Sequence, residues 1–272
     1  MTDTPPLSPQ PAQPESGAES TDRTTGATRR AVLTSLGGAT LGLAAVSLAG
    51  PAVAQATPAA TRNGADRSST ALAAACVLTP EQTEGPYYLD LETVRENITE
   101  GKPGVPLSLR ITVVNATTCS PLPNTAVDVW QCDAVGVYSG YVAGGSTPDT
   151  TFLRGVQLTD SAGVAEFTTV YPGWYVGRAI HIHVKTHVGG TVSGGKYQGG
   201  HVSHTGQLYF PETYNTSVAA LNPYRTNRAT RTLNARDGIY RNGGSSTLLT
   251  VTQTGTDLSA GVIGTVVLGV NP

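Results

Sequence analysis

The stretch Pro172-Gly173-Trp174-Tyr175-Val176-Gly177-Arg178-Ala179-Ile180-His181-Ile182-His183-Val184 decides the fold, because apolar and polar side chains alternate along its second half. In a β-strand, the side chains of residues i and i+2 point to the same face of the sheet. The two isoleucines and Val184 therefore face a buried layer, and His181 and His183 project side by side on the opposite face. The stretch predicts a half-buried strand that carries two neighbouring imidazoles.

Short strand patterns recur along the chain after residue 76. They occupy residues 107–115, 126–132, 164–170, 179–187, 247–253 and 262–270, and the segment 217–231 is compatible with one or two short helical turns. The chain has 272 residues, of which 32 are Gly and 18 are Pro, and only 13% are charged, which is typical of a turn-rich protein. We predict an all-β fold, a β-sandwich of mostly antiparallel strands with few short helical turns.

Residues 1–54 have the pattern of a twin-arginine-type (Tat) signal peptide. A polar leader ends at Arg29-Arg30, residues 31–49 are apolar and uncharged, and Ala52-Val53-Ala54 supplies the small residues of a cleavage site. An uncleaved membrane anchor stays an alternative, although its Gly, Ala and Thr residues make the apolar run only weakly hydrophobic. We expect an exported or secreted bacterial protein with no stable membrane span after cleavage.

Composition also indicates how residues 55–272 are organised and which partners they favour. Residues 55–75 predict a flexible linker, because they lack periodicity and are rich in Ala, Thr and Ser, and residues 76–272 are long enough for one sandwich domain. A formal net charge of -2 gives no support for a nucleic-acid partner. With Cys76, Cys119 and Cys132, an exported protein is expected to hold one disulfide and one free thiol, and the pairing stays open.

Two tyrosines near the histidines would complete an unusual metal site. Tyr175 precedes the His181 strand, and Tyr138 follows Gly136-Val137 further upstream. Because an unperturbed Tyr has a pKa of about 10, a phenolate ligand at neutral pH needs a strong Lewis acid, which favours Fe(III) over Zn(II). An isolated His-x-His is also compatible with ordinary hydrogen-bonded histidines, but Tyr175 and Arg178 beside the pair favour the metal site.

Several motifs follow one another in a fixed order between residues 79 and 211. They are Glu84-Gly85-Pro86-Tyr87-Tyr88, Val127-Asp128-Val129-Trp130-Gln131-Cys132-Asp133-Ala134, Gly136-Val137-Tyr138-Ser139, Thr159-Asp160-Ser161-Ala162-Gly163, Pro172-Gly173-Trp174-Tyr175, Arg178-Ala179-Ile180-His181-Ile182-His183 and Gln207-Leu208-Tyr209-Phe210. Each motif alone is weak. The ordered set resembles the intradiol ring-cleavage dioxygenases, a family that opens catechol rings between the two hydroxylated carbons.

The resemblance implies a non-haem Fe(III) cofactor held by four of these residues. Tyr138 and His181 would be the equatorial ligands, and Tyr175 and His183 the axial ones. A diol that binds through both oxygens needs two neighbouring coordination positions, so one protein ligand and a bound hydroxide must leave. Tyr175 is the expected leaving ligand and base, because a phenolate can depart with a substrate proton.

The resemblance also assigns residues around the iron. Arg178 and Gln207 match the family's active-site Arg and Gln, and Tyr87 matches a residue that lies against the substrate ring. Arg178 is out of phase with the His181 strand, but a bend after Gly177 could aim its guanidinium at the ring, where it would stabilise developing negative charge. Trp130 shares a strand face with Asp128 and is expected in the core.

The implied substrates are a small aromatic diol and O2, and the product is a muconate-type dicarboxylate. Catechol, hydroxyquinol, protocatechuate and lignin-derived diols all remain open. The spacing between Tyr175 and His181 is shorter than in many intracellular relatives, which suggests a more open pocket for bulkier catechols. The oligomeric state stays open.

Other functions remain compatible with parts of the sequence. One alternative is an exported β-sandwich that binds carbohydrate or protein and carries a vestigial metal site, with its Tyr residues and Gly-rich loops serving the binding. A zinc hydrolase built on His181 and His183 would leave the tyrosines unexplained and lacks a nearby carboxylate ligand. His187, His201 and His204 are expected in solvated loops and not as ligands.

Overall fold

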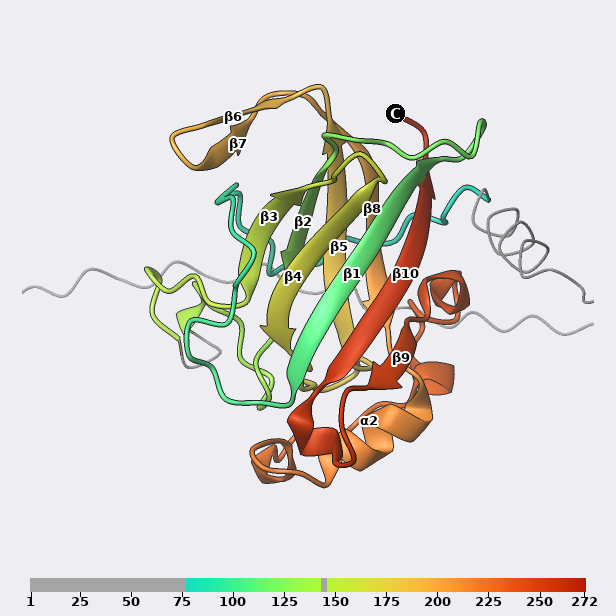
Figure 1. The fold of residues 1–272 in the computed structure, drawn as a ribbon. Helices are drawn as coiled ribbons and strands as arrows, with labels where there is room; N and C mark the ends of the chain where they lie inside the picture. Colours follow the sequence, from blue (N-terminus) through green and yellow to red (C-terminus); the bar gives the residue numbers. More distant parts are fainter. Residues whose placement is uncertain (1–76, 143–145) are drawn as a thin grey trace, which may run out of the picture. The chain divides into compact units, whose positions relative to one another are not determined.

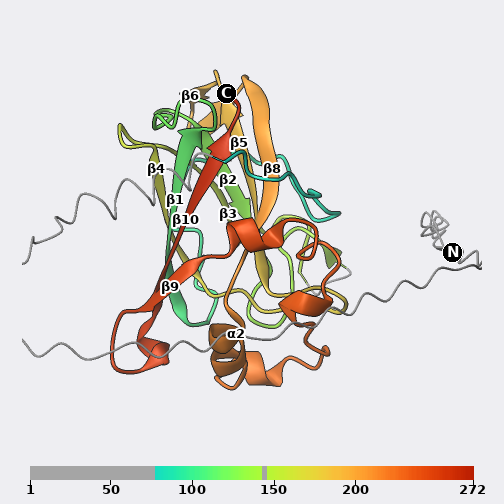
Figure 2. The same cartoon turned by 90° about the vertical axis from the view of Figure 1, so that its right-hand side faces the viewer.

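Two four-stranded sheets form the body of the protein (Figure 1). The computed structural model describes residues 77–142 and 146–272, all of which belong to one compact unit. The first sheet has the order β4-β1-β10-β9, the second has the order β3-β2-β5-β8, and β6 and β7 form a separate hairpin. Figure 2 shows the two larger sheets as layers that face each other.

The strands are short and mostly antiparallel. Their bounds are β1 Pro106–Asn115, β2 Ala126–Trp130, β3 Arg154–Leu158, β4 Val164–Val170, β5 His181–Val188, β6 Thr191–Ser193, β7 Lys196–Gln198, β8 His201–Tyr209, β9 Thr250–Gln253 and β10 Val262–Val270. Strands β1 and β10 pair in parallel, whereas the other ladders between these strands are antiparallel. The predicted all-β sandwich of mostly antiparallel strands is confirmed.

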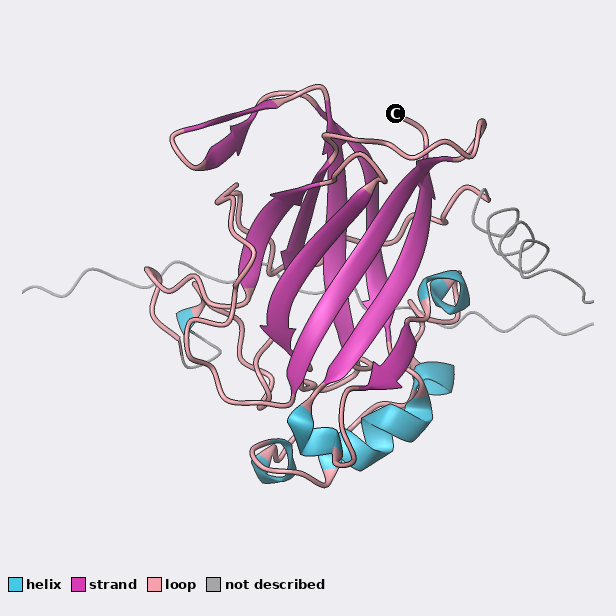
Figure 3. Cartoon of the chain, in the orientation of Figure 1, coloured by secondary structure: helices cyan, strands magenta, loops and turns pink. Residues whose placement is uncertain are grey.

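The helices and 3-10 turns with assigned bounds in the described part of the chain are brief and lie after β8. They are α2 Glu212–Ala219 and the 3-10 turns η2 Tyr224–Thr226, η3 Asn234–Arg236, η4 Gly244–Thr247 and η5 Leu258–Ala260. Figure 3 shows that these helices gather around the end of the sandwich where β9 lies. The helical turns expected over 217–231 are present, but α2 begins earlier than predicted.

The core lies between the two sheets and explains their alternating sequences. Leu107, Leu109 and Ile111 of β1 pack in one hydrophobic cluster with Ile182 and Val184 of β5. Because neighbouring residues of a strand face opposite ways, the histidines of β5 lie on the outer face of the second sheet. The site described below is therefore built on the reverse side of strands whose inner side forms the core.

Sequence patterns located most strands but missed β3, β6, β7 and β8. Strands β4 and β10 have the predicted bounds, and β5 begins at His181, two residues later than predicted. Strand β8 was missed because Gly and polar residues, including two histidines, interrupt its pattern.

The expectation of solvated-loop histidines is wrong. His187 lies on β5, and His201 and His204 lie on β8. His204 is buried, and this burial lowers the pKa of its imidazole to about 4.

The structure describes two of the three cysteines and none of the N-terminal segment. Cys119 is disulfide-bonded, and Cys132 is a buried free thiol. Cys76, the signal peptide of residues 1–54 and the linker of residues 55–75 lie outside the described residues. Within the described part of the chain, no helix has the length and hydropathy needed to cross a membrane.

Candidate active site

Polar atoms of three predicted ligands converge at the start of β5. The Nε2 atoms of His181 and His183 are 3.1 Å apart, and the hydroxyl of Tyr175 lies 3.3 Å from the Nε2 of His181. Tyr138 joins them from the loop after β2, with its ring centroid 5.8 Å from that of Tyr175 and 6.2 Å from that of His183. The strand supplies both imidazoles because their spacing of two residues places them on one face.

Hydrogen bonds and stacking fix the orientation of the two imidazoles. The Nδ1 of His181 lies 2.6 Å from the carbonyl oxygen of Ala179. A carbonyl can only accept a hydrogen bond, so Nδ1 carries the proton and Nε2 presents a lone pair to the site. Trp130 stacks on the His183 ring, with centroids 4.9 Å apart and planes 7° apart.

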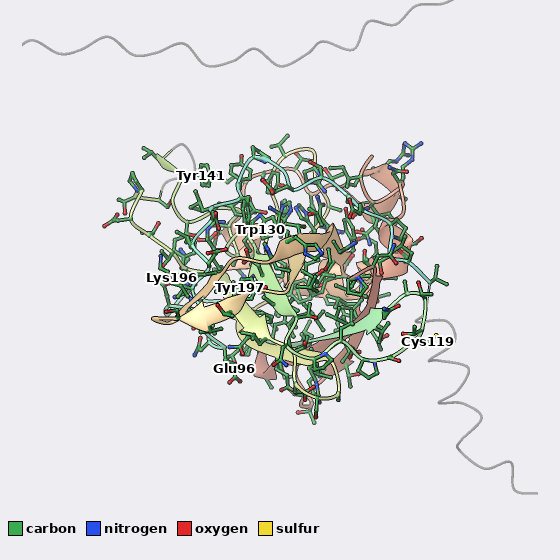
Figure 4. All side chains as sticks on the ribbon, turned by 90° about the horizontal axis from the view of Figure 1, so that it is seen from above. Glu96, Cys119, Trp130, Tyr141, Lys196 and Tyr197 are labelled. Carbon is green, nitrogen blue, oxygen red and sulfur yellow. The ribbon has the colours of Figure 1, made fainter. Side chains whose placement is uncertain are left out.

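Trp130 is buried as expected, but not between the sheets. It lies with Tyr138 and Cys132 in a separate cluster on the site face, and Figure 4 shows it in the interior of the molecule. Its ring therefore supports the candidate ligands instead of the main core.

The cluster has the electrostatics of a cation site without a carboxylate. Burial lowers the pKa of His181 to about 3 and that of His183 well below its ordinary value. Burial also raises the pKa of Tyr138 well above 10, and that of Tyr175 to about 12. Two imidazoles that resist protonation, with their Nε2 atoms 3.1 Å apart, are matched by a metal cation.

The hydroxyl of Tyr138 supports the same conclusion. It is buried and has no hydrogen-bond partner among the described residues. A buried polar atom without a partner costs about 1–3 kcal/mol, so such an atom calls for a ligand. The described residues contain no group of three or more His, Cys, Asp or Glu side chains that could hold a metal, and this cluster relies on tyrosines instead. The residues present therefore fit a hard metal cation.

Arg178 and Gln207 lie together beside the histidine pair. Arg178 donates through Nη2 to the Oε1 of Gln207, and the hydroxyl of Tyr209 donates to the same oxygen at 2.9 Å. Gln207 pairs with His183 across the β5–β8 ladder. The predicted bend is present, because Gly177 has a φ of +84° and Arg178 precedes the strand.

A strap formed by residues 83–88 crosses the site. Tyr87 of the strap stacks on Tyr138, with centroids 4.5 Å apart and planes 13° apart. A Cβ atom added to Gly85 would lie 3.2 Å from Cε1 of His183, so the strap backbone lies directly against this imidazole. The strap therefore forms one wall of the cluster.

Side chains from the sheet and a nearby loop hold the strap in place. Gln207 donates to the carbonyl oxygen of Thr83 at 2.9 Å, and Lys185 forms an ion pair with Glu84. The hydroxyl of Tyr141 donates to the carbonyl oxygen of Tyr88 at 3.0 Å. Figure 4 shows Tyr141 closer to the edge of the molecule than Trp130.

Arg154 is a buried residue of the site that the sequence did not reveal. It donates to the carbonyl oxygen of Tyr87 at 2.7 Å and to the hydroxyl and carbonyl oxygens of Ser139, each at 2.8 Å. It thereby links the strap to the residue that follows Tyr138. No local pattern marks Arg154, because its partners are distant in sequence or in an irregular loop.

Asp237 is a second residue that the sequence did not reveal. It is fully buried, and its Oδ2 accepts from the Nε of Arg178 at 2.9 Å. It belongs to a loop after η3 that carries no recognisable motif. The structure thus brings all seven predicted site residues into one neighbourhood and adds Arg154 and Asp237 to it.

Comparison with known proteins agrees with this geometry. A family model described as Dioxygenase matches residues 83–216. An intradiol ring-cleavage dioxygenase from Tetranychus urticae is 32% identical, with coverage of 72% of this chain and 96% of that protein and a TM-score of 0.62. The dioxygenase domain of a carbohydrate-binding fusion protein from Streptomyces sp. SirexAA-E is 30% identical, with coverage of 69% and 94% and a TM-score of 0.49.

No curated protein matches the chain. The identity and coverage of the Tetranychus urticae dioxygenase are sufficient to place it, and the family model agrees. The chain belongs to the family of intradiol ring-cleavage dioxygenases.

Proposed function

We propose that this protein is a non-haem Fe(III) dioxygenase that cleaves a catechol-type ring between its two hydroxylated carbons and incorporates both atoms of O2. The observation that carries the proposal is the cluster of two phenols and two imidazoles, in which no described carboxylate takes part. Tyr138, Tyr175, His181 and His183 would hold the iron. When bound, Fe(III) supplies a Lewis acid that binds both oxygens of the diol and promotes attack of O2 on the ring.

The two tyrosines would have different tasks because their burial differs. Tyr138 is 2% exposed and packed beneath Tyr87, so it is suited to stay in place. Tyr175 is only partly buried and sits in a loop before β5. The Oη atom of Tyr175, as a phenolate, would accept the proton of a diol hydroxyl.

Arg178 and Gln207 would bind and orient the reacting ring. The guanidinium is partly buried beside Gln207 and is held before any substrate arrives. A fixed cation in this position stabilises negative charge that develops on the ring. Tyr87 supplies an aromatic wall, and the substrate that it contacts would be a small aromatic diol.

The decisive experiment combines colour with product analysis. The purified protein, loaded with Fe(III), should absorb visible light through its phenolates and should convert catechol and O2 into a muconate-type dicarboxylate. The same protein loaded with Zn(II) serves as the control and should be colourless and inactive. An iron-loaded protein with no visible band and no ring opening on catechol, hydroxyquinol or protocatechuate would contradict the proposal.

We also propose, from the sequence alone, that residues 1–54 direct export by the Tat route. The motive is Arg29-Arg30 before an uncharged apolar run. Replacement of both arginines by Lys should retain the protein inside the cell, because the guanidinium pair differs from two ammonium groups in hydrogen bonding. The mature exported protein should begin near Gln55. Unchanged export of the Lys-Lys variant would exclude this route.

A further inference from the structure

Asp237 accepts four hydrogen bonds although its side chain is removed from solvent. Its Oδ2 accepts from the Nε of Arg178 at 2.9 Å and from the backbone N–H of Ala179 at 2.7 Å. Its Oδ1 accepts from the N–H groups of Ile239 and Tyr240 at 2.7 and 3.1 Å. Each oxygen of the carboxylate therefore has two N–H donors.

This pattern requires a carboxylate and excludes an amide. In either orientation, the side-chain NH2 of an Asn would face two N–H donors, and two hydrogen bonds would be lost. A carboxylate can accept all four, and the hydrogen bond from the guanidinium is charge-assisted. The four N–H donors therefore favour Asp over Asn at this position.

Arg178 is held between Asp237 and Gln207 through different nitrogen atoms. Nε donates to Asp237, and Nη2 donates to Gln207 and lies 3.5 Å from the hydroxyl of Tyr209. Because the guanidinium is planar, two contacts on different nitrogens fix the plane as well as the position of the charge. A Lys in its place would present a point charge without this fork.

Ala179 connects the same carboxylate to a candidate iron ligand. Its N–H donates to Asp237, and its carbonyl oxygen accepts the Nδ1 proton of His181. Asp237 thus anchors the segment of Arg178 and Ala179. This segment supplies both the guanidinium and the carbonyl oxygen that orients the imidazole of His181. None of the four hydrogen bonds that Asp237 accepts comes from an imidazole or from a candidate tyrosine ligand.

We infer that Asp237 is a positioning residue, which holds the guanidinium of Arg178 in a fixed plane beside the histidine pair so that its charge meets the substrate ring. This inference rests on the proposed ring-cleavage function for its catalytic consequence. The physical contact on which it depends can be tested without catalysis. Asp237 lies outside residues 83–216, where the family model matches, so the inference concerns a part of the chain beyond that match.

The first experiment measures the hydrogen bond directly in the metal-free protein. The Nε–H signal of Arg178 is assigned by NMR through its loss in Arg178→Ala, and its exchange with solvent is compared between the native protein and Asp237→Asn. We expect slow exchange in the native protein and exchange at least about tenfold faster in the variant, because the charged acceptor facing Nε is replaced either by an NH2 group or by a neutral and weaker amide oxygen. Unchanged exchange in a folded Asp237→Asn protein would overturn the inference.

The control variant is Glu212→Gln. Glu212 pairs with Arg231 at 2.6 Å and accepts from the N–H of Asn234 at 2.6 Å, so it anchors the chain just before Asp237. If Asp237 only fastened this loop, both substitutions would have similar effects. We expect Glu212→Gln to leave the Arg178 signal and turnover close to native, and a loss equal to that of Asp237→Asn would contradict a positioning role.

The second experiment is a double-mutant cycle on the iron-loaded protein. Asp237→Asn should lower kcat about tenfold or more with a smaller change in KM, because the fixed charge acts on the transition state. In an Arg178→Ala background, the same substitution should change kcat less than about threefold, since its target is gone. Equal effects in the two backgrounds would refute the coupling.

A further variant keeps the test informative if Asp237→Asn does not fold. Arg178→Lys retains the charge and the carboxylate partner but lacks the planar fork. It should lose turnover by about tenfold, and native turnover would show that a fixed plane is unnecessary. If the native iron-loaded protein itself fails to open catechols, the proposed function is wrong, whereas the NMR comparison still decides the contact.

Discussion

Tyr138 and Tyr171 are both buried, but their hydroxyl groups have opposite environments. The hydroxyl of Tyr138 has no hydrogen-bond partner among the described residues, whereas that of Tyr171 donates to the Oδ1 of Asn215 at 2.7 Å. A fold stabilised only by its own contacts would have little reason to bury the first hydroxyl. The difference separates a residue that awaits a ligand from one that serves the fold.

This difference gives a matched pair of substitutions. Tyr138→Phe should leave the metal-free protein at least as stable, because no hydrogen bond is lost, and should weaken iron binding about tenfold or more. Tyr171→Phe should lower the free energy of unfolding by about 0.5–1.5 kcal/mol and keep the iron. Thermal unfolding of the apo proteins and metal analysis measure both effects. Full iron retention by Tyr138→Phe would rule out a ligand role.

Asp128 provides a pH-dependent prediction at the same scale. Burial raises the pKa of its carboxyl to about 7, and the negative charge of Asp90 raises this pKa further. A hydrogen bond from Tyr88 and the positive charges of Lys185 and Arg154 lower the pKa and offset part of the rise. A carboxyl with a raised folded-state pKa stabilises the fold below its unfolded pKa, and this stability is lost as pH rises toward 7.

Asp128→Asn should remove this contribution. The difference in unfolding free energy between native protein and variant should therefore change between about pH 4 and 7, with the native protein losing stability relative to the variant as pH rises. Chemical denaturation at a series of pH values gives this difference. Parallel curves over the whole range would exclude the assigned protonation.

The site could be predicted from sequence only where its residues share a local pattern. His181 and His183 lie two residues apart on one strand, and the ordered motifs pointed to Tyr138 and Tyr175. Asp237 could not be found in this way, because it meets Arg178 only after the chain has folded back. Buried charged residues in irregular loops have no periodicity from which their partners could be inferred.

At the scale of elements, the strap of residues 83–88 combines a backbone requirement with a close approach. Gly85 has a φ of +74°, a conformation that costs a residue with a Cβ roughly 1–2 kcal/mol. The Cβ atom would also meet His183 at 3.2 Å. Gly101 has the same φ of +74° but no atom within 4 Å of an added Cβ.

Alanine substitutions of these two glycines distinguish the effect of backbone strain from the effect of contact with His183. Gly85→Ala should lower iron affinity and turnover, because the added methyl group displaces the imidazole of His183. Gly101→Ala should cost similar stability but leave iron binding unchanged. Iron titration and denaturant unfolding of the two variants measure these effects. Equal iron affinity in both would show that the strap does not constrain the imidazole.

The elements themselves were predictable to different degrees for a physical reason. Strands β4 and β10 alternate regularly because one face is packed and the other is open to solvent. Strand β8 has polar residues on the site face and a Gly and a buried His on the other, so the alternation that identifies a strand is weakened. The polar residues of the site, together with the Gly and the buried His, therefore hid the strand pattern of β8, which carries Gln207.

At the scale of the whole molecule, the hydrophobic core lies between the two sheets, and the candidate site lies on the outer face of the second sheet. Leu268 of β10 is fully buried in the core between the sheets, and its neighbour Val267 is 38% exposed on the outer face of the first sheet. Leu268→Ala should cost about 2–5 kcal/mol of unfolding free energy, and Val267→Ala about 0.5 kcal/mol. Denaturant unfolding checks these values.

Neither of these two substitutions should change turnover per folded, iron-loaded molecule at a temperature where both variants are folded. The reason is that the site residues lie on the reverse side of the second sheet, beyond the core layer. A selective loss of iron in Leu268→Ala, with folding intact, would show that the core and the site are coupled more tightly than the two-layer arrangement indicates.

The parallel ladder between β1 and β10 governs how the chain can reach its native state. Leu107 lies opposite Val262, so the centre of the first sheet joins strands separated by most of the domain's sequence. Loop-closure entropy opposes such pairing, and folds dominated by distant contacts form in milliseconds to seconds instead of microseconds. During synthesis, the phenols and imidazoles are produced well before β10, which lies between β1 and β9 in the first sheet. We expect these groups to stay unassembled until β10 has paired and the two sheets have packed together. Metal capture is therefore expected to follow closure of the sandwich, and a chain stalled before β10 would offer these groups to any cation within reach.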